Sequence, residues 1–426
     1  MKKLKVYYTQ QRMIRLLISK EESNMLCKLK ILFVSSAYPP ESDDSIWTYT
    51  IIMASALASR GHEVHILSCV RGQKHKDYLD QGVFIHLRGQ VRIRFLDRIN
   101  RILQVPRTIA RLHIGLSTFF EYRRLDIDFD IIEYPDWEAE GLIFALLRTR
   151  PLVAELHTPL PLIHKYSYLP MNRDIFLASA LEHFAVRHAD AIISPSRLLI
   201  QALKDIGWLP DLSPSIIPHA IDWWHWCDNI CSVLDTPPTV LFLGNLTRLK
   251  APELLTEAIS IVRREIPEAK ALFAGGNSGR RDGLPYLEWI KKSTSDLDGC
   301  QFVGHVRRRE LTHLLSISRV LVIPSWFENY SLVALEAMAA GRPIIVTSMS
   351  GITELIKQTG VGFIVPQGDP KTLAKVLLSL LEDPAYAARE GEKARATVQE
   401  WSDPDKIAVQ REIVYQRAIT SSKHKM

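Results

Sequence analysis

The stretch VLVIPSWFENYSLVALEAMAAGRPIIVTSMSGITEL, residues 320–355, predicts a strand, a loop, a helix and a second strand in succession. The apolar run Val320–Ile323 is typical of a buried parallel strand, and a Pro-Ser pair ends it. Ser331 stands at the N-cap of a helix over Leu332–Ala340, which a Gly-Arg-Pro sequence closes. Such a unit is typical of doubly wound α/β folds, in which ligands bind outside the carboxyl ends of the strands.

Two glutamates give this unit its chemistry. Glu328 lies in the loop, and Glu336 lies just over one turn inside the helix, with its side chain leaning back towards the mouth of the site. The N–H groups of Leu332 and Val333 have no partner within the helix and form a site for a phosphate. We therefore expect Glu328 to meet sugar hydroxyls and Glu336 to hold a ribose diol, with a diphosphate between them. A capped helix with two solvated glutamates is the alternative.

The sequence PSWFENYSLVALEAMAAGRP, followed by GITEL, resembles the signature of glycosyltransferase family 4, whose members are retaining enzymes of the GT-B fold. That family carries a Pro-Ser pair, a Glu, seven residues, a second Glu, then Ala-Met-Ala and Gly-x-Pro. The resemblance covers residues 30–420. It implies an α/β protein of two Rossmann-like, doubly wound domains that face each other across a cleft, with the acceptor mainly on the first and the donor nucleotide-sugar mainly on the second.

The length of 426 residues suits two or three domains. We expect the basic residues 1–28 to be a flexible extension or the product of a misplaced start upstream of Met25; a polybasic membrane arm is the alternative. The remaining chain is expected to divide into an N-terminal Rossmann-like acceptor domain at 29–225, a linker at 226–238, a nucleotide-sugar donor domain at 239–400 and a C-terminal helix at 401–426 that crosses back to the first domain.

The composition is that of an ordinary globular protein, with 47% hydrophobic and 23% charged residues. The five cysteines form neither a metal-binding nor a disulfide pattern, so we expect no metal. No cofactor is expected beyond the nucleotide-sugar, which is a co-substrate. No apolar run is long enough to span a membrane. The expected location is the cytoplasm, with a peripheral place at the inner face of the plasma membrane left open.

The net charge of +6 is concentrated in one segment. Nine arginines lie between Arg88 and Arg124 against two acidic residues. The spacing of Phe95, Ile99 and Ile102 predicts a basic amphipathic helix. A core-packed helix with a solvated basic face explains this pattern, and so does a surface that rests on anionic lipid or meets an anionic acceptor. Nucleic acid is not expected, because no aromatic-interleaved basic motif is present.

The resemblance also implies roles outside the first stretch. In NLTRLK, residues 245–250, Lys250 matches the family's diphosphate-binding lysine and is well placed as a phosphate counter-charge. The family's arginine is replaced by the neutral Asn245, and Arg248 is a candidate substitute. Gly276 ends the strand ALFAGG in a Gly-Gly turn at the expected cleft.

Two further positions concern the N-terminal domain. His157 ends the strand LVAELH, where the family places a histidine that touches a hydroxyl of the donor sugar; a purely structural histidine is the alternative. The family's first loop carries two glycines where this chain carries Asp43 and Asp44. Glycine allows close approach of a phosphate, whereas two carboxylates repel it. The residues expected at the reaction centre are thus Glu328, His157 and Lys250.

The resemblance implies a retaining, metal-independent glycosyltransferase that uses a nucleotide-sugar donor, and we expect a glycan or lipid-linked acceptor in surface polysaccharide biosynthesis. Closure of the domains would exclude water, because hydrolysis is the competing reaction. A catalytically silent nucleotide-sugar-binding or scaffold protein is the main alternative, since Asn245 and the two aspartates remove charge and glycine from the phosphate site. A different GT-B reaction, phosphorolysis or epimerisation, is the third, and the glutamate pair argues against it.

Overall fold

Short apolar runs form a parallel sheet in the N-terminal half of the chain. The computed structural model describes residues 28–36, 45–209, 213–227, 231–294 and 296–423. Across the eight-stranded sheet of the N-terminal half, the strands are β3 (Lys76–Asp80), β4 (Val83–Gly89), β2 (Glu63–Val70), β1 (Lys30–Val34), β5 (Ile131–Pro135), β6 (Leu152–Glu155), β7 (Ala191–Ser194) and β8 (Ser215–Ile216). Only β3 runs antiparallel to its neighbour among these strands.

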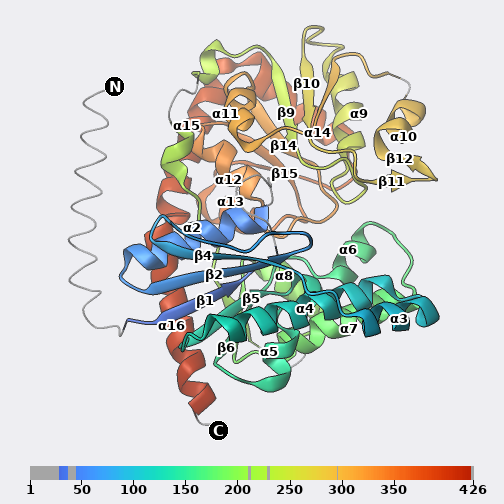
Figure 1. Cartoon of the computed structure of the whole chain (residues 1–426). Helices are drawn as coiled ribbons and strands as arrows, with labels where there is room; N and C mark the ends of the chain where they lie inside the picture. Colours follow the sequence, from blue (N-terminus) through green and yellow to red (C-terminus); the bar gives the residue numbers. More distant parts are fainter. Residues whose placement is uncertain (1–27, 37–44, 210–212, 228–230, 295, 424–426) are drawn as a thin grey trace.

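A second parallel sheet organises the C-terminal half (Figure 1). Its six strands, in spatial order, are β13 (Cys300–Gly304), β10 (Lys270–Ala274), β9 (Thr239–Leu243), β14 (Val320–Ile323), β15 (Ile344–Thr347) and β16 (Phe363–Val365). A small hairpin of β11 (Arg280–Arg281) and β12 (Leu284–Pro285) lies apart from it. The central strands are buried throughout. The predicted α/β fold with two Rossmann-like halves is confirmed.

Helices connect the strands of each sheet. The N-terminal half contains α2 (Ser45–Ser59), α3 (Arg94–Leu103), α4 (Pro106–Leu125), the 3-10 turn η1 (Trp137–Ala139), α5 (Leu142–Leu147), α6 (Leu160–Tyr166), α7 (Arg173–Arg187) and α8 (Arg197–Asp205). The C-terminal half contains η3 (Val233–Asp235), α9 (Pro252–Val262), α10 (Tyr286–Ser293), α11 (Arg308–Ser316), α12 (Leu332–Ala339), α13 (Thr353–Thr359), α14 (Pro370–Glu382) and α15 (Pro384–Trp401).

The chain passes between the halves twice, and the two crossings touch. The first crossing follows β8 and contains η2 (Trp223–Trp226), and the second joins α15 to α16 (Pro404–Lys423). The backbone N–H of Ile221 donates to the carbonyl of Ser402 at 3.1 Å, which links the crossings directly. The expected C-terminal helix from residue 401 therefore begins three residues late, because Trp401 ends α15 and Pro404 opens α16.

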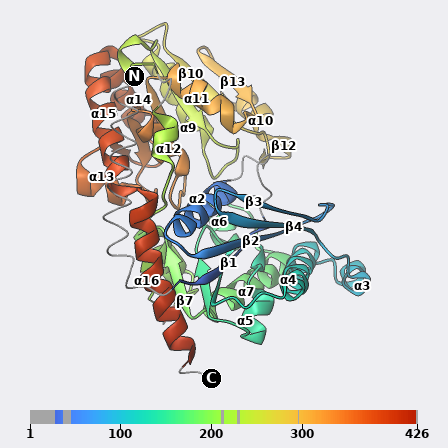
Figure 2. The ribbon, with the colours of Figure 1, turned by 60° about the vertical axis from the view of Figure 1, so that its left-hand side comes forward.

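Helix α16 lies along the N-terminal half (Figure 2), where it packs against α2. Its Arg411 is buried and pairs with Glu133 of β5 and with Glu155 of β6, the latter at 2.6 Å. The Tyr415 hydroxyl donates to Glu133 at 2.5 Å. A second contact joins Glu412 to Arg60 at 2.6 Å. The last helix thus carries charges into the interior of the opposite half.

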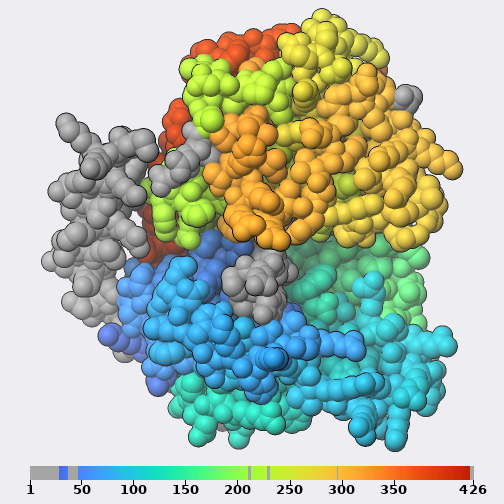
Figure 3. All heavy atoms as spheres, turned by 45° about the horizontal axis from the view of Figure 1, so that its top comes forward, coloured from blue at the N-terminus to red at the C-terminus, as the bar shows by residue number. Residues whose placement is uncertain are grey.

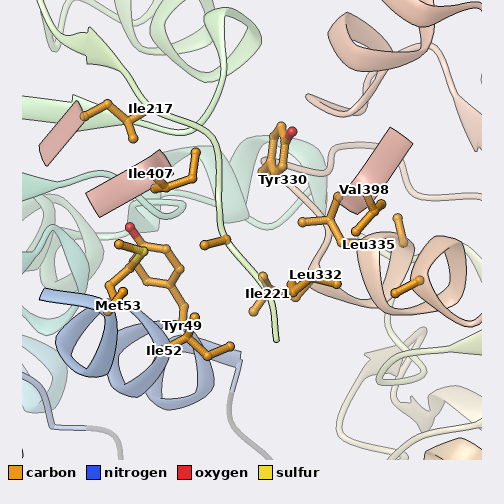
Figure 4. Packing of buried hydrophobic residues seen from close by; sticks show 14 of the residues in the cluster. Tyr49, Ile52, Met53, Ile217, Ile221, Tyr330, Leu332, Leu335, Val398 and Ile407 are labelled. Atoms are coloured by element: carbon orange, nitrogen blue, oxygen red, sulfur yellow. The ribbon is translucent and has the colours of Figure 1, made fainter. Parts of the chain in front are cut away.

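The two halves share one apolar cluster. In the space-filling view, the C-terminal half sits directly on the N-terminal half (Figure 3). Tyr49 of α2, Ile221 of the first crossing and Leu332 of α12 belong to the same cluster of buried side chains, as do Val398 and Ile407 near the second crossing (Figure 4). Each large apolar side chain buried in this way contributes about 1.5–3 kcal/mol, so the contact between the halves is part of the core.

Two details of the N-terminal half differ from the sequence-based expectations. The segment between β5 and β6 forms two short pieces, η1 and α5, rather than one helix, because Glu138 and Ala139 adopt positive φ angles of 59° and 52°. In the basic segment, Arg88 and Arg111 are buried rather than exposed. Arg111 pairs with Glu182 at 2.5 Å. The other seven arginines of the segment are exposed on α3, α4 or the flanking turns.

Candidate active site

The loop between β14 and α12 is fixed by backbone hydrogen bonds. The N–H of Glu328 donates to the carbonyl of Met349 at 2.9 Å, and the N–H of Gly351 donates to the carbonyl of Glu328 at 2.8 Å. The Thr347 hydroxyl donates to the carbonyl of Ser325 at 2.6 Å. These bonds hold the loop, and with it the first glutamate, at the carboxyl end of the sheet.

Lys250 lies against the Glu328 carboxylate. Its Nζ donates to Glu328 Oε2 at 2.5 Å, and the Ser325 hydroxyl lies 3.4 Å from the same oxygen. The two residues meet because β9 and β14, which precede them, are neighbouring strands. About a third of the Lys250 side chain and 13% of the Glu328 side chain are exposed, so both can be reached by a ligand. Two of the three residues expected at the reaction centre are therefore together.

The N-cap predicted at Ser331 is confirmed. Its hydroxyl accepts a hydrogen bond from the N–H of Ala334 at 3.2 Å, and α12 begins at Leu332. The N–H groups of Leu332 and Val333 lie in the first turn, where the helix supplies no acceptor. Because the helix dipole is positive at this end, the turn suits an anionic group such as a phosphate.

Glu336 does not present the open carboxylate that its position in the helix predicted. The residue is 2% exposed, and its Oε1 lies 2.7 Å from Nη2 of Arg308, the first residue of α11. Burial raises the pKa of Glu336, and the charge of Arg308 opposes that rise. The sequence analysis did not anticipate Arg308, because it used the geometry of a single helix, whereas α11 supplies a partner. The expected ribose role of Glu336 stays a prediction.

Asn245 is used to hold a turn. Its Oδ1 accepts a hydrogen bond from the N–H of Gly276 at 3.1 Å, and the carbonyl of Gly276 accepts from Leu246 at 2.8 Å. A Cβ on Gly276 would lie 3.0 Å from Asn245 Oδ1. The Gly-Gly turn after β10 is thus bound to the loop after β9, at the same end of the sheet as Lys250.

Arg248 contacts the opposite half. Its guanidinium carbon lies 4.1 Å from the ring centroid of Tyr168, which follows α6. Trp326 packs edge-on against the same ring, with the centroids 6.2 Å apart. A cation above an aromatic ring is stabilised by about 0.5–2 kcal/mol. In this structure Arg248 therefore joins the halves, and its expected substitution for the missing phosphate arginine stays a prediction.

His157 lies at the carboxyl end of β6, in the N-terminal half. Its backbone N–H donates to Asp136 at 3.0 Å, and its ring lies near those of Tyr49 and His219, with both centroid distances 6.0 Å. Burial lowers the pKa of His157 to about 4. The imidazole is therefore neutral at neutral pH and can donate or accept a hydrogen bond, but it carries no charge.

Asn329 connects His157 to the glutamate loop, a link that the sequence analysis missed. The Asn329 amide donates to the carbonyl of His157 and, at 3.4 Å, to that of Leu156. Its Oδ1 accepts from the Ser196 hydroxyl at 3.2 Å. The sequence signal that could have revealed this link was the position of Asn329 directly after Glu328. An amide buried at that place must find several hydrogen-bond partners. Asn329 thus bonds the β14–α12 loop to two strand ends of the other half.

Phe327 was also missed as a contact residue. It is buried within the apolar cluster of the N-terminal half, and its ring stacks on Tyr166 with centroids 4.6 Å apart. A second contact runs from the carboxylate of Glu354 to the N–H of Leu198 at the start of α8, at 3.0 Å. The sequence signal for the Phe327 contact was an apolar side chain within the otherwise polar loop SWFENY. Together these contacts bring the strand ends of both halves to one place.

Some expected features lie outside the described residues or concern metals. Asp43, Asp44 and residues 1–27 are not among the residues described. Within the ranges given above, no group of three or more His, Cys, Asp or Glu side chains is arranged to hold a metal ion. In the same part of the chain, no helix is both long and apolar enough to cross a membrane.

The chemistry available at this junction follows from the side chains present. A cation (Lys250), an acceptor for hydroxyl groups (Glu328) and a helix N-terminus (α12) lie at one strand end, with a neutral histidine from the other half nearby. This set can neutralise a diphosphate and orient sugar hydroxyls.

Comparison with known families and proteins agrees with the site. Residues 46–223 match the model of Glycosyltransferase Family 4, and residues 232–397 match that of Glycosyl transferases group 1. A glycogen synthase of Mycobacterium tuberculosis is 27% identical over 381 residues, covering 86% of this chain and 89% of that protein. A D-inositol 3-phosphate glycosyltransferase of Streptomyces avermitilis is 35% identical over 161 residues, 36% of this chain and 34% of that protein.

Solved structures share the fold. Sucrose-phosphate synthase from Thermosynechococcus elongatus superposes with a TM-score of 0.71 at 20% identity, covering 92% of this chain and all of that one. Anabaena HepE in complex with UDP and glucose superposes with a TM-score of 0.65 at 18% identity, covering 90% and 98%. The two family models together span most of both halves, including Lys250, Glu328 and His157. The chain therefore belongs to glycosyltransferase family 4 and is a glycosyltransferase of the GT-B fold.

Proposed function

We propose that this glycosyltransferase moves a sugar, with retention of configuration and without a metal, from a nucleoside diphosphate donor to a glycan or lipid-linked acceptor in surface polysaccharide biosynthesis. The observation that carries the proposal is the Lys250–Glu328 pair beside the N-terminal turn of α12. In this proposal Lys250 and the helix N–H groups together neutralise the leaving diphosphate, a task that a divalent cation performs in other enzymes. A solved structure of the same fold was obtained with UDP and glucose, which supports a donor of this class.

The test is nucleotide release from UDP-, GDP- and ADP-sugars by the purified protein, in EDTA and with Mg²⁺. An α-glucan, inositol phosphate and a polyprenyl-phosphate sugar serve as acceptors, and NMR of the product reports the anomeric configuration. We expect release from one donor with one acceptor, equal in both buffers. A nucleotide-induced rise in melting temperature without nucleotide release with any acceptor would favour the catalytically silent binding protein. The neutral Asn245 is the observation that supports this second candidate. Inversion of configuration would refute retention.

The exposed basic segment supports an acceptor at a membrane surface. Phe95 and Ile102 of α3 are 68% and 80% exposed, among exposed arginines of the same helix. A pocket of about 460 Å³ nearby is lined by Val91, Phe120, Arg123 and Arg124. Apolar side chains beside arginines match the headgroup region of an anionic bilayer. We therefore place the anionic lipid surface against α3 and the end of α4.

Charge reversal tests the membrane surface. Arg98, Arg101 and Arg107 changed together to Glu should release the protein from phosphatidylglycerol vesicles in a flotation assay, since each basic residue near such a surface contributes about 1 kcal/mol. The control changes Lys371, Lys375 and Arg389, exposed residues of the C-terminal half, and alters the net charge equally. Equal loss in both variants, or none in either, would dismiss α3 as the contact.

Asn245→Arg should tighten nucleotide diphosphate binding about fivefold. A charge-assisted hydrogen bond contributes about 1.5–3 kcal/mol, and the lost bond to Gly276 costs about 0.5–1.5 kcal/mol, which leaves a net gain near 1 kcal/mol. Asn245→Ala, which removes the Gly276 bond without adding charge, should weaken binding slightly. Calorimetry with UDP measures both variants. Equal affinity of the two variants would show that an arginine at 245 does not reach the diphosphate.

A further inference from the structure

The two glutamates of the β14–α12 unit are each matched by one cation. Glu328 pairs with Lys250 at 2.5 Å, and Glu336 pairs with Arg308 at 2.7 Å. Lys250 comes from the loop after β9 and Arg308 from the first turn of α11. Of these two cations, the sequence resemblance supplied a role for Lys250 alone, so Arg308 has no assigned role.

Arg308 lies where it can fix the position of the Glu336 carboxylate. Its guanidinium carbon lies 5.1 Å from the ring centroid of Trp226, a side chain only 1% exposed, which limits its movement on one side. The Arg308 side chain is 36% exposed, whereas Glu336 is 2% exposed. Any group that approaches the Glu336 carboxylate from the solvent therefore meets Arg308 beside it.

The charge of Glu336 depends on this contact. Burial disfavours an isolated carboxylate, which would instead take up a proton. A protonated carboxyl has one oxygen committed as a donor, whereas a carboxylate accepts hydrogen bonds at both oxygens. A vicinal diol presents two hydroxyl donors, so only the charged form matches it fully. The guanidinium of Arg308 supplies the positive charge that keeps the matching form in place.

We propose that Arg308 is a positioning residue of the donor site, which holds the Glu336 carboxylate as an anion and orients it to accept the two ribose hydroxyls of the nucleotide. The inference rests on the proposed function, because it needs a nucleotide at this site. It adds a residue from α11 to a site otherwise built from α12 and from the loops after β9, β10 and β14. Arg308 acts through Glu336. It does not take over the role of the family's phosphate-binding arginine, whose position Asn245 occupies in this chain.

A ribose-specific readout separates positioning from simple support of the fold. Calorimetry of the full chain with UDP, GDP and ADP identifies the nucleotide that binds, and titration with its 2′,3′-dideoxy counterpart gives an affinity ratio. We expect the wild type to favour the ribonucleotide at least about tenfold. Arg308→Ala should abolish this preference, and Arg308→Lys should restore part of it. The control Arg309→Ala, an exposed neighbour on α11, should behave as the wild type.

Glu336→Gln completes the test. If Arg308 acts through Glu336, this variant loses the same preference, and Arg308→Ala added to it causes no further change in the ratio. An Arg308→Ala protein that keeps the preference overturns the proposal, and so does one that loses affinity equally for both nucleotides, because that result indicates a structural role only. A wild type that binds none of the three diphosphates overturns the proposed function and this inference together.

Discussion

Lys250→Ala is expected to lower turnover of the nucleotide-sugar about ten- to a hundredfold. The change removes the cation that lies 2.5 Å from Glu328 and leaves that carboxylate unpaired beside the expected diphosphate. A hydrogen bond to a charged group contributes about 1.5–3 kcal/mol, and 1.4 kcal/mol corresponds to a factor of ten. Because the leaving group gains negative charge in the transition state, the loss should fall mainly on kcat.

Nucleotide release from the preferred donor measures this effect. The matched control is Lys270→Ala, since Lys270 is exposed at the start of β10, at the end of the sheet away from the site. Lys270→Ala should keep wild-type turnover. Near-normal turnover of Lys250→Ala would remove Lys250 from the phosphate site, and a fall in both variants would point to a general loss of fold.

Arg411→Ala is expected to lower the free energy of unfolding by about 3–5 kcal/mol, the usual cost of removing one partner from a buried ion pair. Arg411 is the cation between Glu133 and Glu155, and both carboxylates are buried. Without it, these groups can remain in the interior only as neutral acids. Urea unfolding at pH 7 measures the loss, with Arg417→Ala, exposed on the same helix, within about 0.5 kcal/mol of the wild type.

The variant should also depend on pH in a defined direction. In the wild type, burial raises the pKa of Glu133 from 4.5 to about 8, against the opposing hydrogen bond from Tyr415, and removal of the Arg411 charge should keep this pKa raised. Between these values the native state of Arg411→Ala holds protons that the unfolded chain releases, so its stability should fall as the pH rises. Adding Glu133→Gln and Glu155→Gln should flatten this dependence and restore part of the stability. A pH-independent loss would show that the ion pairs are not its cause.

The sequence predicted the parts of the site that depend on local chemistry or on sheet order. The cap at Ser331 follows from the hydrogen bonds that a helix start requires, and it formed as expected. The resemblance implied that Lys250 and Glu328 share one site, and they meet because parallel strands bring their carboxyl ends to one edge. The first inference needed no distant contact, and the second, between residues 78 positions apart, needed the family motif and the order of the strands.

The features that were missed depend on contacts between distant segments. Arg308 lies on a different helix from Glu336, and no pattern within either helix reveals their pairing. Asn329 bonds to residues of the other half, 172 positions away in the case of His157. The strand β3 was overlooked because its side chains are largely exposed, with no apolar alternation to mark it. Local propensity cannot report such contacts, since tertiary packing decides them.

The hydrogen bond between Ile221 and Ser402 defines an axis for relative motion of the halves. Because both passages of the chain meet at this point, we expect relative motion of the halves to be a rotation centred near it, with little displacement of the backbone there. Atoms far from this axis move more than atoms near it. The hydrogen bond from Asn329 to His157 would therefore be stretched by such a rotation. A few degrees of rotation would part the two strand ends and admit an acceptor, and the return stroke would bring the neutral imidazole back beside the glutamate loop.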